Sequence, residues 1–223
     1  MSTTGAVIVA AGRSTRMGGI DKLMAPLAGR PVVLHSVAAF VEHEMVDEVV
    51  VVVSESNLDA VEALLAEEGL DARIVLGGER RRDSVRHGLA VLHRCEYVLV
   101  HDAARPLVTP ALIEAALHGA HEYGAALCAI PVTDTVKLGD DTGEVQATLD
   151  RSGLWLAQTP QAFRLETLLR AHAAHEDDAT DDASLVEEMG AHVHLVPGAP
   201  RNIKVTTPAD LVIAEALLTL EHP

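Results

Sequence analysis

The segment VHDAARPLVT, at residues 100–109, joins an apolar run to charged side chains that could bind a metal ion or a phosphate. Asp102 offers hard oxygen ligands, and Mg²⁺ usually takes only one or two carboxylates beside phosphates and water. Arg105 could bind an anion, or it could form an ion pair with Asp102. A strand end that only meets water would also carry polar groups, so this segment alone leaves both interpretations open.

A second candidate site follows the first apolar run, in AAGRSTRMGGIDK at residues 10–22. Its small residues let the backbone approach a ligand closely, and backbone N–H groups in such a loop can bind phosphate oxygens. Arg13, Arg16 and Lys22 add three cations. The pattern therefore predicts a phosphate-binding loop rather than a purely structural turn.

Common nucleotide-binding and hydrolase motifs do not fit the chain. The dinucleotide motif G-x-G-x-x-G fails because Ser14 stands where the second glycine would fall. The P-loop motif fails because five residues, not four, separate Gly12 from Gly18, and Gly19 follows. The sequence also has no G-x-S-x-G and no H-E-x-x-H motif, so the nucleophile or the metal site that a hydrolase would need is missing from these patterns.

Three other groups of residues give weaker signals. His192 and His194 alternate along a predicted strand, but no third ligand follows at metal-binding spacing, which argues against zinc. HEDDATDD, at residues 175–182, lacks the spacing of a calcium loop and is interpreted as a solvated loop, apart from Thr180. The run ERRR, at residues 79–82, follows a Gly-Gly pair, and we expect it on the nucleotide side of a cleft.

The composition is that of a soluble globular protein with an acidic surface. Hydrophobic residues make up 48% of the 223 residues and aromatic residues only 2%, and the net charge is −16. This charge opposes binding to nucleic acid but still allows a small anion in a locally basic cleft. No apolar run reaches the roughly 18 residues that span a bilayer, and the N-terminus lacks a signal-peptide pattern. Cys95 and Cys128 form no CxxC pair and indicate reduced thiols. We therefore expect a cytoplasmic protein that binds neither nucleic acid nor membrane.

Short aliphatic runs alternate with helix-like segments along the chain. Runs that are rich in Val and Ile, and apolar on both sides, predict strands buried on both faces of a parallel sheet. The predicted strands cover residues 5–12, 47–54, 72–78, 96–102, 126–132 and 192–198. The predicted helices cover residues 31–43, 57–69, 82–94 and 109–124, with a closing amphipathic helix within 206–223. This alternation predicts an α/β fold with a doubly wound, mostly parallel sheet, which binds ligands at the carboxyl ends of its strands.

The alternation is interrupted at residues 133–160. Two short strand-like runs flank Asp140–Gly143, which predicts a β-hairpin turn. An isolated hairpin is marginally stable in water, so this one is expected to pack on the body or on a second subunit. We find no repeat and no linker, and we predict a single domain over residues 1–223 with an extruded β-arm at 133–157.

Taken together, several segments resemble the 2-C-methyl-D-erythritol 4-phosphate cytidylyltransferase family of the non-mevalonate isoprenoid pathway. In chain order they are AAGRSTRMGGIDK, GGERRRDSV, VHDAARP, DTVK, DRSGLWLAQTPQAF, TDDAS and NIKVT. The resemblance runs from about residue 5 to the C-terminus. It implies a Rossmann-like nucleotidyltransferase fold and a reaction of CTP with methylerythritol phosphate that gives CDP-methylerythritol and pyrophosphate, with Mg²⁺ as the cofactor.

The resemblance also implies roles for residues at matching positions. Arg16 and Lys22 would stabilise charge on the reacting α-phosphate, and Asp102 would be the candidate metal ligand. The nucleotide would be bound by Ala10, Ala11, Gly12, Gly78, Glu79, Ser84, Asp102 and Lys204. The sugar phosphate would be bound by Arg105, Thr135, Arg151 and Thr180. In the family the arm exchanges between the subunits of a homodimer, so its two residues would serve the site of the neighbouring subunit.

The expected chemistry agrees with a site built from cations. A phosphate monoester has a second pKa near 6, so at neutral pH it is already a nucleophile and needs no general base. The site must instead position the reactants in line and neutralise charge on the α-phosphate. For this reason His101 is not expected to be a catalytic residue.

Two departures from the family and two alternatives remain. The family often has glycine where Ser14 stands, and it tends to have proline where Asp21 precedes Lys22. An aspartate there would weaken the field of Lys22 unless its carboxylate points away. The first alternative is a cytidylyltransferase for ribitol 5-phosphate or another sugar phosphate. The second is a non-catalytic nucleotide-binding homologue, against which the presence of both Arg16 and Lys22 argues.

Overall fold

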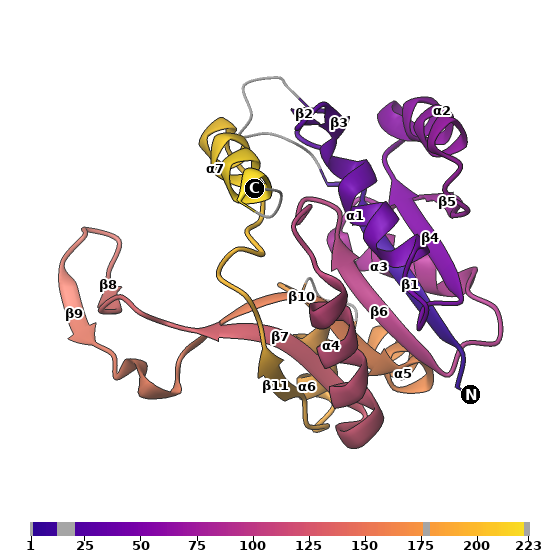
Figure 1. Ribbon diagram of the computed structural model, residues 1–223. Coiled ribbons are helices and arrows are strands. Elements are labelled where there is room, and N and C mark those ends of the chain that lie inside the picture. The colour runs from indigo at the N-terminus through magenta and orange to yellow at the C-terminus, as the bar shows by residue number, and fades with distance from the viewer. Residues whose placement is uncertain (1, 13–20, 176–178, 221–223) are drawn as a thin grey trace.

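The computed structural model describes residues 2–12, 21–175 and 179–220. The strands of its main sheet are β1 (Thr4–Ala10), β4 (Glu48–Val53), β5 (Arg73–Leu76), β6 (Tyr97–Asp102), β7 (Ala125–Pro131), β10 (Trp155–Arg164) and β11 (His194–Pro197). They lie in the order β11-β7-β10-β6-β1-β4-β5 (Figure 1). All neighbouring pairs are parallel except those of β10, which runs antiparallel to both β6 and β7. The predicted doubly wound, mostly parallel α/β sheet is therefore confirmed.

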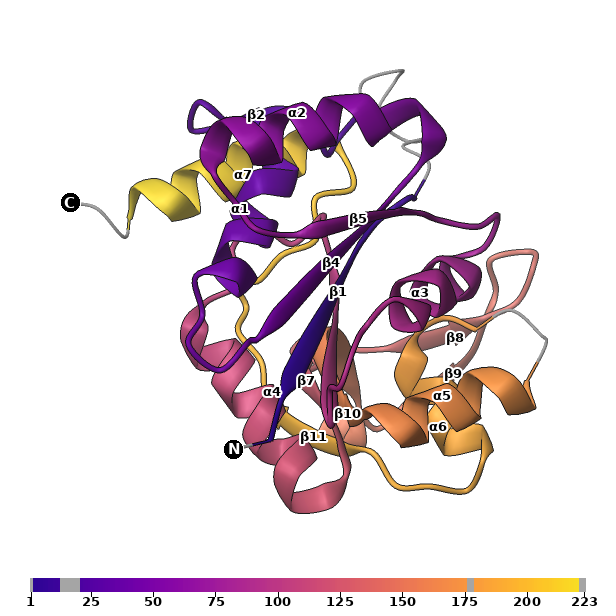
Figure 2. The same cartoon turned by 90° about the vertical axis from the view of Figure 1, so that its right-hand side faces the viewer.

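Helices cover both faces of this sheet (Figure 2). One face packs against α1 (Val32–Val41), α2 (Leu58–Glu68), α4 (Pro110–Tyr123) and α7 (Pro208–Thr219). The other packs against α3 (Arg81–Ala90), α5 (Leu165–Ala174) and α6 (Asp182–Glu188). Strand β4 shows why an all-valine run suits this position, because Val49, Val51 and Val53 pack on the first face while Val50 and Val52 pack on the second.

Helix boundaries follow the stop and start signals of the sequence. Gly69 ends α2 with a φ of 67°, a left-handed conformation that glycine adopts without steric cost. Pro110 begins α4 directly after Thr109, as predicted. The helix predicted at 82–94 ends earlier, at Ala90.

The closing helix α7 begins with a capping box formed by Thr207 and Asp210. One side of α7 packs on the core through buried Ala214 and the partly buried Leu211, Leu217 and Leu218, as an amphipathic helix should. Val212 and Ile213 on its other side are exposed apolar residues, so the separation of polar and apolar residues is incomplete. Of the helices in the described part of the chain, none is long and apolar enough to cross a membrane.

Strand β10 and helices α5 and α6 were not predicted. The sequence of β10, WLAQTPQAFR, contains Pro160, and a proline normally argues against a central strand because it cannot donate to the hydrogen-bond ladder. The structure accommodates it at an irregularity, where the pairing with β7 shifts register between Ala157 and Gln161. The strand then pairs with β6 from Gln161 to Arg164 and so lies inside the sheet, between β7 and β6.

The predicted hairpin is present as β8 (Lys137–Gly139) and β9 (Val145–Thr148), which form a separate two-stranded sheet. Its turn is held by the Asp140 carboxylate, which accepts hydrogen bonds from the backbone N–H groups of Thr142 and Glu144. A short 3₁₀ turn, η2 (Arg151–Gly153), leads back towards β10. In Figure 1 this arm extends away from the rest of the molecule. The remaining short elements are β2 (Pro26–Leu27), β3 (Arg30–Pro31) and η1 (Glu55–Asn57).

Candidate active site

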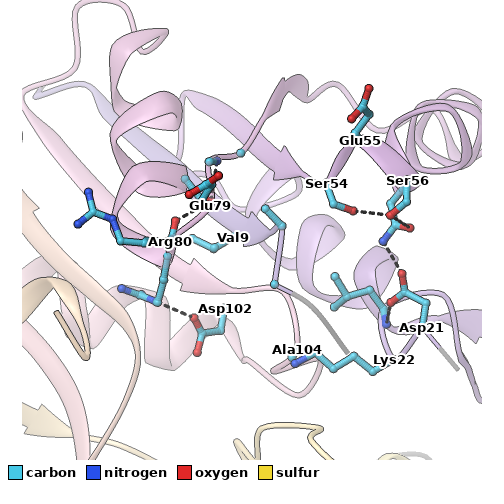
Figure 3. Close-up of a pocket in the computed structure, with 18 of the residues that line it drawn as sticks. Val9, Asp21, Lys22, Ser54, Glu55, Ser56, Glu79, Arg80, Asp102 and Ala104 are labelled. Carbon is cyan, nitrogen blue, oxygen red and sulfur yellow. Dashed lines mark hydrogen bonds and ion pairs between the residues drawn. The ribbon is translucent and has the colours of Figure 1, made fainter. Parts of the chain in front are cut away.

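A cavity of about 860 Å³ opens at the carboxyl ends of β1, β4, β5 and β6 (Figure 3). In a doubly wound sheet this edge is where ligands bind. The turns behind these strands and the segment before α7 supply its walls. The charged residues that line it are Asp21, Lys22, Glu55, Glu79, Arg80, Arg81, Asp102 and Lys204.

The described ends of the loop predicted to bind phosphate border this cavity. Ala11, Gly12 and Lys22 line it, whereas Ala10 is buried at the end of β1 and does not line it. Outside the described residues lie Arg13, Ser14 and Arg16. The roles predicted for these three residues therefore stay predictions.

Asp21 is turned towards the segment that follows β4, on its own side of the cavity, and not towards Lys22 (Figure 3). One carboxylate oxygen accepts a hydrogen bond from the Asn57 amide, and the other accepts one from the backbone N–H of Leu23 at 2.9 Å. In Figure 3 the Lys22 side chain extends away from this carboxylate, towards Ala104. The departure from the family at Asp21 thus joins the loop to the segment after β4 and leaves Lys22 facing the cavity.

The Gly-Gly pair after β5 brings two walls of the cavity into close contact. A Cβ atom on Gly77 would lie 2.4 Å from the Cβ of Ala11, and one on Gly78 would lie 2.5 Å from the Cβ of Asp83. The backbone N–H of Gly78 donates a hydrogen bond to Ser84 Oγ at 3.1 Å. Only glycine permits this approach, which places Glu79 and Ser84 on the cavity wall.

Asp102, at the end of β6, lies at the centre of a cluster of charges. Its Oδ2 accepts a hydrogen bond from Lys204 Nζ at 2.6 Å, and its Oδ1 lies 3.6 Å from Nε of Arg81. Burial by itself would raise the pKa of this carboxyl, but the positive charges of Arg81 and Lys204 outweigh burial and hold the pKa well below its usual range. Asp102 is therefore ionised at neutral pH.

His101 is a structural residue that supports Asp102 and Arg105. It is fully buried, and burial lowers its pKa to about 4. Because a carbonyl can only accept, Nε2 donates to the Arg105 carbonyl at 3.2 Å, so Nδ1 accepts from Thr159 Oγ1 at 3.0 Å. Thr159 Oγ1 in turn accepts from the backbone N–H of Asp102 at 3.1 Å. A neutral histidine thus holds both ends of the segment that carries the site.

A second cavity of about 230 Å³ adjoins the first on the side of β10. Arg105 and Thr180 line it, and Arg81, Asp102 and Lys204 line both cavities. The Arg105 guanidinium donates to the carbonyl of Asn202 at 2.7 Å, so a backbone acceptor, and no direct ion pair with Asp102, holds its orientation.

The interpretation of the acidic segment at 175–182 as a solvated loop is wrong for Asp181 and Asp182, while residues 176–178 lie outside the described part of the chain. Asp182 is fully buried and forms a 2.7 Å ion pair with Arg81, and Asp181 caps α6 by accepting from the backbone N–H of Ser184. Sequence reasoning also missed Arg81 as an individual site residue, although it expected the run at 79–82 on this side of the cleft. The sequence did carry a signal for it. Consecutive residues of a helix point in different directions, so only some of the three arginines at the start of a predicted helix can face one cavity.

Thr135 and Arg151 lie on the arm and line neither cavity of this chain. Both are exposed, and the Arg151 guanidinium donates a hydrogen bond to the Thr133 carbonyl. Within one chain the structure therefore does not bring them to the other predicted site residues.

The donor set at the cavity allows a metal ion only if the ligand contributes to its coordination. In the described part of the chain, no cluster of three or more His, Cys, Asp or Glu side chains could hold a metal ion. Among the described carboxylates, Asp102 is the one that lines both cavities, and it is ionised. A single carboxylate fits Mg²⁺ when phosphate oxygens and water complete an octahedral shell.

A doubly wound sheet that gathers Arg81, Lys204 and the ionised Asp102 carboxylate at its strand ends agrees with a nucleotidyltransferase. Comparison with known proteins makes this class specific. Residues 4–220 match the family model for 2-C-methyl-D-erythritol 4-phosphate cytidylyltransferase, and the chain belongs to this family. The predicted resemblance is thereby confirmed.

Individual relatives agree with this assignment. The 2-C-methyl-D-erythritol 4-phosphate cytidylyltransferase of Dehalococcoides mccartyi is 46% identical over 216 residues, which cover 96% of this chain and 95% of that protein. The bifunctional enzyme IspD/IspF of Desulforudis audaxviator is 49% identical over 225 residues, which cover 98% of this chain but 57% of that longer protein.

Solved structures show the same fold. The chain is similar to 4-diphosphocytidyl-2C-methyl-D-erythritol synthase from Anaerococcus prevotii, with a TM-score of 0.85 and 30% identity over 98% of this chain and 99% of that one. It is also similar to 2-C-methyl-D-erythritol 4-phosphate cytidylyltransferase from Thermus thermophilus, with a TM-score of 0.79, 34% identity and coverage of 98% and 100%. These comparisons do not favour the alternative acceptors.

Proposed function

We propose that this chain transfers the cytidylyl group of CTP to the phosphate of 2-C-methyl-D-erythritol 4-phosphate, giving CDP-methylerythritol and pyrophosphate. The observation that carries the proposal is the Lys204–Asp102–Arg81 cluster between two cavities in a chain of this family. One cavity has room for a nucleotide, and the other adjoins it on the side of the same carboxylate.

The larger cavity is the proposed CTP site. Ala11 and Gly12 offer a closely approachable backbone to the phosphates, and Gly78, Glu79 and Ser84 form the wall for the base and ribose. Lys22 lines the same cavity and would, together with Arg16, stabilise the charge on the α-phosphate.

The smaller cavity is the proposed site of the acceptor. Arg105 and Thr180 line it, and Arg105 is oriented for an anion by its bond to the Asn202 carbonyl. Thr135 and Arg151 would reach this site from the arm of a second subunit, which makes the proposed enzyme a homodimer. Both side chains are exposed and line neither of the two cavities of their own chain, which supports this exchange.

The proposed reaction is an in-line attack of the acceptor phosphate on the α-phosphate of CTP, with pyrophosphate as the leaving group. The acceptor phosphate is a dianion near pH 7 and needs no general base, which agrees with the burial of His101. Asp102 would hold Mg²⁺ together with phosphate oxygens, and the bound ion would supply neutralisation of the triphosphate. Lys204 keeps the Asp102 carboxylate in place from its other side.

We place this activity in the cytoplasm and away from membranes and nucleic acid. The proposed substrates are charged small molecules, and the net charge of −16 disfavours a polyanionic partner.

Pyrophosphate release from CTP tests the proposal directly. Purified protein with Mg²⁺ should release pyrophosphate with methylerythritol phosphate and not with ribitol 5-phosphate, and chelation of Mg²⁺ should abolish the release reversibly. Lys204→Met should lower kcat on the order of 10²–10³-fold, because it removes one preorganised charge. Arg86→Met, on the exposed side of α3, is the matched control and should keep wild-type rates. Release with ribitol 5-phosphate would overturn the acceptor, and CTP binding without release to either acceptor would indicate a non-catalytic homologue.

A further inference from the structure

Arg81, the first residue of α3, lies at the junction of the two cavities and lines both. Its neighbours in the arginine run are used differently. Arg80 forms a 2.8 Å ion pair with Asp83, and Arg82 is buried and donates to the backbone carbonyl of His172 at 3.0 Å. Arg81 is therefore the arginine of this run whose side chain stands between the two proposed substrates.

A buried carboxylate holds Arg81 from behind. Asp182 Oδ2 accepts a 2.7 Å hydrogen bond from Arg81 Nη1, and its Oδ1 lies 3.1 Å from Nε2 of His172 on α5. A carboxylate removed from water is unfavourable unless its oxygens are paired, and here both are. Since an ionised carboxylate only accepts, Nε2 of His172 must carry the proton of this bond.

The electrostatics agree with this geometry. Burial alone would raise the pKa of Asp182, but the charge of Arg81 and the hydrogen bond from His172 lower it below the usual range. Asp182 and Asp102 in turn outweigh the effect of burial on Arg81 and raise the pKa of its guanidinium. Arg81 is thus fixed between a buried carboxylate on α6 and the Asp102 carboxylate, whose Oδ1 lies 3.6 Å from its Nε.

We propose that Asp182 and His172 are a pair of positioning residues that hold the Arg81 guanidinium where the α-phosphate of CTP meets the phosphate of the acceptor. The inference rests on the proposed function, and it adds a support for the site that lies outside both cavities in α5 and α6. A guanidinium held in this way needs no rearrangement as charge builds up on the phosphate oxygens, which is the condition for strong electrostatic stabilisation.

Kinetics of single variants test the chain of contacts. Arg81→Met should lower kcat on the order of 10²–10³-fold. Asp182→Asn should lower kcat roughly tenfold to a hundredfold with a smaller change in the KM for CTP, because the guanidinium remains but is misplaced. His172→Gln keeps an N–H donor for Asp182 and should retain most activity, whereas His172→Leu should not. Arg86→Met on the same helix is the control.

The double variant separates positioning from a general loss of structure. If Asp182 acts through Arg81, the pair Arg81→Met with Asp182→Asn should be no slower than Arg81→Met alone. If the two losses multiply instead, or if His172→Leu is as active as His172→Gln, the inference is wrong. Circular dichroism and the melting temperature of each variant identify any that fail to fold, and the conservative His172→Gln keeps the test informative in that case.

Equilibrium binding distinguishes this inference from the proposed function. Calorimetric titration with CTP and Mg²⁺ should show roughly two- to fivefold weaker binding for both Arg81→Met and Asp182→Asn, because the α-phosphate is already charged before the reaction but gains more charge during it. A wild-type protein that binds CTP but releases no pyrophosphate would overturn the proposed function while leaving this contact testable. Wild-type affinity in both variants would overturn the contact even in an active enzyme.

Discussion

At the scale of single residues, His101 carries a testable prediction about stability. Its pKa is about 4 in the folded protein and 6.5 when unperturbed, since burial lowers it. Above pH 6.5 both states are neutral, whereas between 6.5 and 4 the unfolded chain binds a proton that the folded protein does not. The free energy of unfolding should therefore fall as the pH is lowered through this range, by on the order of 1 kcal/mol per pH unit from this residue.

Urea unfolding at several pH values between 7.5 and 4.5 checks this. His101→Asn takes up no proton, so its unfolding free energy should fall less steeply with decreasing pH than that of the wild type. Parallel pH profiles for the two proteins would contradict a buried neutral histidine. Asp102 does not cause a similar fall in this pH range. Its pKa is lowered in the folded protein, so its contribution to the free energy of unfolding is lost only at more acidic pH.

Residues at the carboxyl end of a predicted strand were the ones that sequence reasoning could place. Asp102, Gly78 and Ala11 lie at the ends of predicted strands, and parallel strands bring their carboxyl ends to one edge. Sequence alone could not pair Asp102 with Lys204, which lies 102 positions further on, because that contact depends on the path of the chain after β11. Sequence alone could not find Asp182 for a related reason. A run of acidic residues is typical of an exposed loop, and Asp182 is buried only because Arg81 of α3 and His172 of α5 pack against it.

At the scale of elements, the close approach of β5 to the loop after β1 predicts the effect of one methyl group. Gly77→Ala would place a Cβ 2.4 Å from the Cβ of Ala11 and 2.7 Å from Ser84 Oγ. Overpacking of this kind typically costs about 1–3 kcal/mol. We expect a lower melting temperature and a higher KM for CTP, because the walls that carry Glu79 and Ser84 must move apart.

A compensating variant tests whether the clash is the cause. Ala11→Gly removes the nearest atom, so the double variant Ala11→Gly with Gly77→Ala should regain much of the lost stability. Thermal unfolding and CTP titration of the two single variants and the double variant measure this. A double variant less stable than Gly77→Ala alone would show that contact with Ala11 is not what the glycine avoids.

The elements that sequence reasoning missed share a physical cause. The predicted strands were homogeneous aliphatic runs, which a sheet covered on both faces requires. Strand β10 has Gln158, Thr159 and Gln161 near its centre, and their polar groups are satisfied by tertiary hydrogen bonds that no local pattern reveals. Helix α5 begins directly after β10, at Leu165, and α6 follows α5 in the chain. Because β10 was not predicted, the alternation of strands and helices gave no place for these two helices.

At the scale of the whole molecule, the arm is the feature that one chain cannot explain. Its apolar side chains are exposed, with 52% for Leu138, 57% for Val145, 44% for Trp155 and 55% for Leu156. A two-stranded hairpin with such a surface is marginal in water. In the proposed homodimer, a second copy of the chain would cover this surface and would also bring its Thr135 and Arg151 to the smaller cavity.

Mixing two inactive proteins tests this exchange. Arg151→Ala should disable the arm, and Lys204→Met should disable the body, so each homodimer is expected to be nearly inactive. In a hybrid dimer, the intact body of the first variant receives the intact arm of the second, which restores one complete site. Co-refolded or co-expressed variants should therefore regain up to about a quarter of wild-type pyrophosphate release, since about half of the dimers are hybrids with one good site each. If every site were built within one chain, both variants would stay inactive in any mixture. Light scattering that shows only monomer would also contradict the exchange of arms.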